Sequence, residues 1–259
     1  MSETFHLPEV NRVGLMAPFE WLKLGWRDFR RAPVTCLAYG AGLAALSLLV
    51  TATLYLTGQF TWFLVLAGGF LIVAPILGMG LYKAACLLER GEKPALPAIL
   101  PQPGMVRADV ILLGVALFVL FGVWAEAAYI VYGLSTYTLH ETIPEFLTFL
   151  LTTEEGRQMG LVGSVIGGGI AFLAFTLVVV SAPMLLDEAN NVFIAVITSI
   201  RSVMSNLPVM LLWAFLISAL VALGMAFALV GLALVFPWIG LSSWHAYRSL
   251  VAPRPALAG

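Results

Sequence analysis

Glu126 is the residue of this chain best placed to do chemistry, because it is the only acid well inside a long apolar segment. A carboxylate at such a position can bind a proton or a cation. The alternative is an acid that joins two helices through a hydrogen bond, for example to a tyrosine hydroxyl. Gly122 and Tyr129 share its side of a helix, since residues three and four apart are neighbours there.

Three other polar residues stand near the ends of apolar segments. Asp187 ends one segment, either as a solvated stop signal or as an ion-pair partner of Arg201, the nearest cation in sequence. His245 lies in SSWHAYR, beside two aromatic residues. Such a histidine is more typical of an interfacial anchor than of a metal ligand, because metal sites need several converging ligands.

The rest of the sequence offers little for catalysis or nucleic-acid binding. It contains no nucleophile–base pair, no glycine-rich phosphate loop and no cluster of metal ligands. The net charge is −1, and no basic run is interleaved with aromatics. We therefore expect no enzyme activity, no catalytic, cofactor-binding or metal site, no cofactor and no nucleic-acid partner.

The composition predicts a protein embedded in a bilayer. Of the 259 residues 61% are hydrophobic and only 10% are charged, and the mean hydropathy is +1.00. Soluble domains carry about 25% charged residues. A helix needs about 20 apolar residues to cross the hydrocarbon. Segments of this kind lie at about 34–57, 62–82, 110–132, 160–186, 207–229 and 231–247.

The last two spans come from one uninterrupted stretch. Residues 202–247 contain no Asp, Glu, Lys or Arg. One helix of that length would be about 69 Å long, twice what a bilayer accommodates. We therefore divide the stretch near Val230 and Gly231, which predicts six spans.

The distribution of basic residues predicts the orientation. With six spans, every Lys and Arg except Arg157 falls on one side of the membrane, together with both termini. Basic loops face the cytoplasm. We therefore expect both the N- and the C-terminus to be cytoplasmic.

Two segments are amphipathic and are expected to lie in the membrane interface, 18–31 and 189–206. In the first, Trp21 and Phe29 share an aromatic face, and Asp28 falls among the charges expected to face water. The even-numbered spans each carry a proline, Pro75, Pro183 and Pro237, which predicts kinks.

The predicted fold is thus an all-α polytopic membrane protein, with six transmembrane helices as three hairpins and amphipathic interfacial helices. Residues 1–259 form a single membrane domain in this interpretation, and the lipid bilayer is its first partner.

Four motifs carry a family resemblance: WLKLGWRDFRRAP, SAPMLLDE, NLPVMLLWAF and PWIGLSSWHAYR. They resemble the landmarks of a bacterial family of predicted integral membrane proteins, the domain of unknown function 2189. Some members are labelled cytochrome c oxidase subunit I-like. The catalytic subunit of such an oxidase holds its haems and copper mainly through six intramembrane histidines, whereas this chain has three histidines in all. We therefore do not expect this chain to be the catalytic subunit of such an oxidase.

Two functions remain open. The first is a non-catalytic accessory or assembly component of a membrane complex, such as a respiratory complex, which binds other subunits or copies of itself. The second is a small transporter or channel for an ion, a lipid or an apolar solute, which would use Glu126 and the proline-kinked helices.

Overall fold

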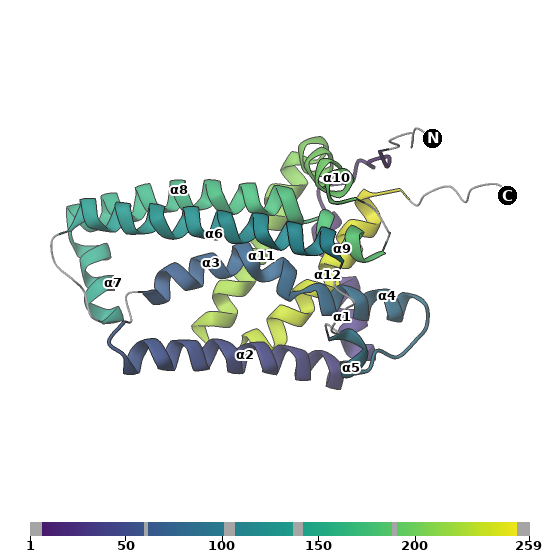
Figure 1. The fold of residues 1–259 in the computed structure, drawn as a ribbon, viewed down its shortest axis with the longest axis horizontal. Coiled ribbons are helices and arrows are strands. Elements are labelled where there is room, and N and C mark those ends of the chain that lie inside the picture. Colours follow the sequence, from purple (N-terminus) through teal and green to yellow (C-terminus); the bar gives the residue numbers. More distant parts are fainter. Residues whose placement is uncertain (1–6, 60–61, 101–106, 137–141, 188–190, 253–259) are drawn as a thin grey trace. The chain divides into compact units, whose positions relative to one another are not determined.

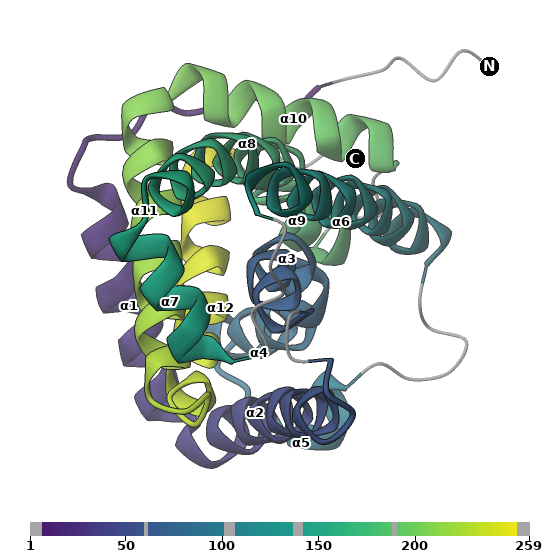
Figure 2. The ribbon, with the colours of Figure 1, turned by 90° about the vertical axis from the view of Figure 1, so that its left-hand side faces the viewer.

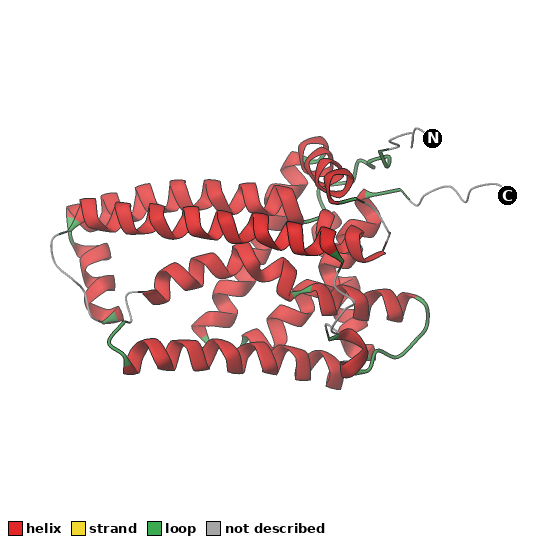
Figure 3. Ribbon diagram, viewed as in Figure 1, coloured by secondary structure: helices red, strands yellow, loops and turns green. Residues whose placement is uncertain are grey.

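The computed structural model describes residues 7–59, 62–100, 107–136, 142–187 and 191–252. These residues form helices, joined by turns and one isolated bridge between Val10 and Val251 (Figures 1 and 3). The chain divides into two compact units. Unit 1 comprises Met1–Ala44, Pro75–Leu113 and Thr176–Gly259, and unit 2 comprises Ala45–Ala74 and Gly114–Phe175. Whether 1–259 acts as one membrane domain stays a prediction.

Five helical segments are long and apolar enough to cross a membrane. They contain the first five predicted spans with shifts of a few residues, as expected when hydrocarbon thickness sets helix length. The segments are α2 (Pro33–Leu56), α3 with α4 (Trp62–Leu77, Met79–Glu89), α6 (Ala108–Ser135), α8 with α9 (Glu154–Val178, Ser181–Asp187) and α11 (Leu207–Ala226).

The sixth predicted span corresponds to α12, Leu232–Leu250, which is not among those five. Its second half, SSWHAYR, is too polar for an apolar span. This half is instead buried within the protein: Ser242, Trp244 and Tyr247 are each inaccessible or nearly so. The predicted six-span layout is therefore not confirmed as drawn.

The division of residues 202–247 near Gly231 is confirmed. Helix α11 ends at Ala226 and α12 begins at Leu232. Ala228 and Leu229 in the connection have positive φ angles of 51° and 64°. At Gly231 an added Cβ would lie 2.7 Å from the carbonyl oxygen of Gly224. The tight turn thus needs a glycine where the two helices meet.

Helix α12 is the centre of unit 1. Helices α1 (Ala17–Arg31), α4 and α11 all pack on it, and α1, α11 and α12 run side by side (Figure 2). A Cβ at Gly25 of α1 would collide with Ser242, and one at Gly240 of α12 would lie 2.7 Å from a methyl group of Leu81. Small residues at such crossings let helices approach closely.

The aromatic face of α1 is covered by protein. Trp21 is 2% exposed and meets Trp213 edge-on with ring centroids 5.5 Å apart. Trp26 meets Trp238 in the same way at 5.4 Å, and the Trp238 indole donates to the Leu22 carbonyl oxygen at 2.8 Å. Only the first aromatic, Phe19, is left half exposed. Most of the aromatic face that we expected to lie in the membrane interface is therefore packed against α11 and α12.

The second amphipathic helix, α10 (Val192–Ser205), is oriented the other way. Its polar side chains Thr198, Ser199 and Ser202 are completely buried. Its apolar stripe is exposed, and it consists of Phe193, Ile197, Ile200 and Met204. Helix α10 meets α11 at a sharp corner (Figure 2). A helix that buries its polar side and exposes its apolar side is suited to an apolar solvent.

Unit 2 contains α7 (Ile143–Thr152) and the larger parts of α3, α6 and α8. Trp124 of α6 fills the space above Gly68 of α3 and Gly167 of α8, and its indole donates to the Val65 carbonyl oxygen at 2.8 Å. Helices α6 and α8 lie side by side (Figures 1 and 2). One face of α6 is therefore packed through Trp124 and its neighbours.

The charge pattern follows the division into units. Unit 2 contains Arg157 and no other Lys or Arg of the chain. Arg157 pairs with Glu154 at 2.6 Å on the surface. All other basic residues belong to unit 1, and so do all the ion pairs described below.

Candidate functional site

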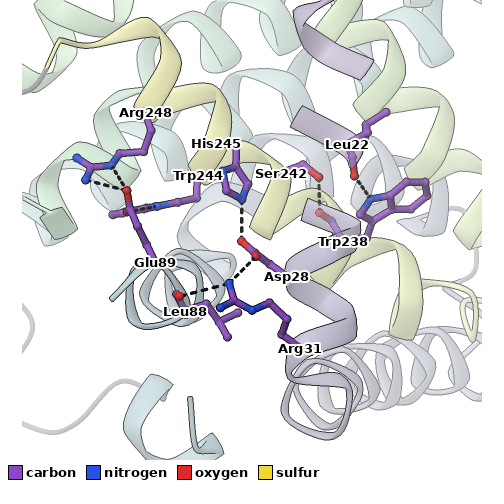
Figure 4. A network of polar contacts seen from close by, with 10 residues as sticks. All are labelled: Leu22, Asp28, Arg31, Leu88, Glu89, Trp238, Ser242, Trp244, His245 and Arg248. Carbon is purple, nitrogen blue, oxygen red and sulfur yellow. Dashed lines mark hydrogen bonds and ion pairs between the residues drawn. The ribbon is translucent and has the colours of Figure 1, made fainter. Parts of the chain in front are cut away.

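The most buried charged contact among the described residues joins α1 to α12. His245 Nε2 lies 2.7 Å from Asp28 Oδ2, a distance at which the ring N–H donates to the carboxylate (Figure 4). Asp28 is 3% exposed, and its other oxygen lies 3.5 Å from the Arg31 guanidinium. Arg31 also donates to the Leu88 carbonyl oxygen at 3.4 Å. Helices α1, α4 and α12 are thereby connected through polar atoms.

A second network is built on Arg248 near the end of α12. Its guanidinium donates to Glu89 of α4 through Nε and Nη2, at 3.1 and 3.0 Å. It also donates to Asp187 of α9 at 3.1 Å, and the Tyr247 hydroxyl donates to the same carboxylate oxygen at 2.9 Å. Arg248 therefore ties the ends of α4 and α9 to α12.

Trp244 completes this network. Its indole donates to Glu89 at 3.1 Å, and its ring lies 5.7 Å below the Arg248 guanidinium (Figure 4). Partial burial acts to lower the pKa of Arg248, but hydrogen bonds to Glu89 and the charges of Asp187 and Glu89 outweigh it and raise that pKa. Arg248 is thus a permanent cation held by two carboxylates, a geometry that suits a guanidinium.

The ion pair expected between Asp187 and Arg201 is not what the structure shows. Asp187 binds Arg248 and Tyr247 instead. Arg201 donates to the Pro8 carbonyl oxygen at 3.4 Å. Arg201 is the nearer cation in sequence, but α10 turns it away from α9 because its buried side is the one that carries Ser199 and Ser202. Glu188, the acid that follows Asp187 in sequence, lies outside the described residues.

Arg107 and Asp109 form a third polar contact that the sequence did not suggest. They pair at 3.0 Å at the start of α6. Asp109 accepts from the backbone N–H of Val192 at 3.0 Å, and Arg107 donates to the Leu185 carbonyl oxygen at 3.3 Å. The pair caps the N-terminus of α10, where a carboxylate is favourable, and fixes it beside α9.

Two of the three prolines lie where a span is interrupted. Helix α3 contains Pro75 and ends at Leu77, whose carbonyl oxygen accepts from the Tyr39 hydroxyl at 2.6 Å. Helix α8 ends at Val178, and α9, which contains Pro183, begins at Ser181. Ser199 bridges this break. Its hydroxyl donates to the Thr176 carbonyl oxygen at 2.7 Å and accepts from Val180 N–H at 3.2 Å.

Pro237 lies inside α12 without a break in the helix. A proline leaves the carbonyl four residues earlier without its helical donor. That carbonyl belongs to Ala233, and it packs directly on Gly40 of α2, where a Cβ would collide with it and with the proline ring. The glycine therefore accommodates the irregularity.

Glu126 stands apart from these networks. It is exposed and lies two residues after Trp124, about 200° around α6 and so opposite the packed face. No hydrogen bond or ion pair of Glu126 is found among the described residues. Of the predicted polar residues, only Asp187 and His245 join the unit 1 networks. Asp187 binds Arg248, and His245 binds Asp28.

The polar networks of unit 1 offer few of the groups that catalysis or metal binding requires. A His–Asp pair can orient a general base, but this requires a nucleophile within reach. The two serines that precede this histidine in sequence, Ser243 and Ser242, donate to the Ile239 and Trp238 carbonyl oxygens at 2.9 and 2.7 Å. Among the described residues no three His, Cys, Asp or Glu side chains are grouped so that they could hold a metal ion. The observed contacts fasten helices together.

Sequence reasoning missed Asp28, Glu89 and Arg248 as members of these networks. One signal was present for Asp28. It follows Trp21 by seven residues, almost two full turns, and so lies at the edge of the aromatic face rather than among the solvated charges. No comparable signal points to Glu89 and Arg248, because their pairing depends on how α4 and α12 pack.

Comparison with known proteins identifies one family. The model of the family described as "Predicted integral membrane protein (DUF2189)" matches residues 63–187. This range contains SAPMLLD, whereas the other three motifs of the resemblance lie outside it. Neither the curated proteins nor the solved structures provide a match. Through residues 63–187, just under half of its length, this chain is similar to the predicted integral membrane protein family DUF2189.

Proposed function

We propose that this chain is a non-catalytic accessory or assembly component of a larger complex in the bacterial inner membrane, a respiratory complex being one candidate. The supporting observation is the placement of Glu126 on the exposed side of α6. A carboxylate that faces lipid inside a span is unfavourable unless it is paired. A partner that supplies a hydrogen-bond donor there removes this cost.

The membrane arrangement in this proposal has six crossings with both termini in the cytoplasm. Helix α12 returns along α11, since Asn206 before α11 binds the Asn11 carbonyl oxygen at 2.9 Å and Asn11 N–H binds the Leu250 carbonyl oxygen at 2.9 Å. The start of α11 and the end of α12 therefore lie close together. Because α11 is long enough to cross, its antiparallel neighbour crosses with it, shielded from lipid by α1 and α4.

The observed side of Glu126 does not favour a transport function. A carboxylate that carries a proton or cation lines an interior path. Glu126 instead lies opposite the face of α6 that packs through Trp124. Solute flux in liposomes that falls when Glu126 is replaced by Gln would restore the transport alternative.

Photo-crosslinking tests the accessory function. A benzophenone side chain replaces Val119, which is 58% exposed on the side of α6 that carries Glu126. The control replaces Leu161 of α8, which is 68% exposed. Illumination of intact membranes is expected to give protein adducts from position 119 and mainly lipid adducts from position 161. Lipid adducts alone at both positions would contradict the proposal.

A further inference from the structure

The exposed side of α6 has the features of a helix–helix interface. Val115, Val119 and Tyr129 are 52%, 58% and 70% exposed, and Glu126 lies among them. At 100° per residue these positions fall within about a quarter of the helix circumference. We call Val115, Val119, Gly122, Glu126 and Tyr129 the outward face of α6. Of the five candidate spans, α6 has the smallest buried share.

The outward face contains both halves of a hydrogen bond. Glu126 offers acceptor oxygens and Tyr129, one turn further along, offers a phenolic donor. The indole of Trp124 is already committed to the Val65 carbonyl oxygen. No Lys or Arg falls within the apolar part of α6. Tyr129 is therefore the donor that this face can present to a carboxylate of another molecule.

We infer that a second copy of this chain covers the outward face of α6, and that Glu126 of each copy accepts a hydrogen bond from Tyr129 of the other. Two copies inserted with the same topology are related by a two-fold axis along the membrane normal. Such an interface is isologous: each copy contributes the same residues at the same depth in the membrane, and each contact occurs twice. Glu126 and Tyr129 differ in height by only about 4.5 Å, which a phenol can bridge.

Gly122 allows the two helices to approach one turn from Glu126. A Cβ added at this glycine would meet no atom within 4 Å, so the position is open in the single chain. Small residues permit close backbone contact between helices in lipid, where packing and interhelical hydrogen bonds drive association. The glycine, the carboxylate and the phenol thus lie on one self-complementary surface.

Disulfide crosslinking in membranes tests this inference. The native thiols Cys36 and Cys86 are free and buried, and both are first replaced by Ala. Gly122→Cys then probes the outward face, where the open space permits the new side chain. Val165→Cys on α8, a position 68% exposed, is the matched control. We expect oxidation to crosslink Gly122→Cys into dimers about tenfold more than Val165→Cys.

The hydrogen bond is tested by substitutions that change a few atoms. Tyr129→Phe and Glu126→Leu should each lower the dimer association constant about tenfold, the effect of losing two ordinary hydrogen bonds in a membrane. Glu126→Gln keeps an acceptor oxygen and should retain most of the dimer. An unchanged association constant in Tyr129→Phe would overturn the inference, as would equal crosslinking of Gly122→Cys and Val165→Cys.

The inference rests on the proposed function, and the two can fail separately. Crosslinks from the outward face to a different protein, with none between copies, would overturn the inference and leave the accessory function standing. Adducts to lipid alone would overturn both.

Discussion

The Asp28 carboxylate of α1 lies 2.7 Å from the ring of His245 in α12, a residue 217 positions later in the chain. Around this contact the two helices meet through aromatic rings and through Gly25, which packs on Ser242. Apolar contacts alone would tolerate a shift of α1 along α12. A buried polar pair does not tolerate such a shift, because the shift would leave both groups without a partner. Asp28 and His245 therefore fix the register of α1 on α12.

Asp28→Ala should lower the free energy of unfolding by about 1–3 kcal/mol, because His245 loses its buried hydrogen-bond partner. SDS titration of the purified protein in mixed micelles measures this quantity. Arg27→Ala, at the exposed neighbouring position of α1, is the control and should change it by less than about 0.5 kcal/mol. Equal effects of the two substitutions would show that the Asp28–His245 contact does not stabilise the fold.

Arg248→Gln should destabilise the ends of α4 and α9 more than α12 itself. The substitution leaves Glu89 and Asp187 without the cation that both carboxylates share. Because all three groups are partly exposed, the expected loss is modest, about 1–2 kcal/mol. Hydrogen exchange should increase in Met79–Glu89 and Ser181–Asp187. Arg30→Gln on the exposed side of α1 serves as the control, and exchange that stays unchanged in both segments would contradict the prediction.

The sequence was a good guide to the helices and a poor guide to their contacts. The bounds of α2, α6 and α11 were predictable because hydrocarbon thickness and the positions of charges limit an apolar helix. The Arg248 network was not, since it joins residues from three distant segments. The amphipathic character of α10 was predictable, but the binding of its polar face to the break between α8 and α9 depends on a packing arrangement that periodicity does not encode.

Ser199→Ala should destabilise the junction of α8 and α9. Its hydroxyl is the partner of both the Thr176 carbonyl and the Val180 N–H, and all of these groups are buried away from water. Leaving a buried backbone group unsatisfied costs about 1–3 kcal/mol. Ser205→Ala, at an exposed position of the same helix, is the matched control for SDS titration. A loss below about 0.5 kcal/mol in Ser199→Ala would mean that the junction does not need the serine.

The exposed stripe of α10 should contact lipid. A nitroxide attached at Ile197 should collide often with oxygen, which concentrates in the hydrocarbon, and seldom with a water-soluble nickel complex. A nitroxide at Ser205, an exposed position off the stripe, should show the opposite preference. Power-saturation EPR in liposomes measures both collision rates. If the nickel complex reached Ile197 as readily as Ser205, the interfacial placement of α10 would be wrong.

The turn between α11 and α12 contains strain that a single substitution should relieve. Ala228 is exposed and has a φ of 51°, a region that disfavours a Cβ by about 1 kcal/mol. Ala228→Gly removes this penalty but also gives the unfolded chain more freedom, so the expected gain is about 0.5 kcal/mol. Gly231→Ala should have the opposite and larger effect, because its Cβ would press on the Gly224 backbone. The melting temperatures of the two variants in detergent should therefore change in opposite directions, and a shift of the same sign would show that the backbone at Ala228 is not strained.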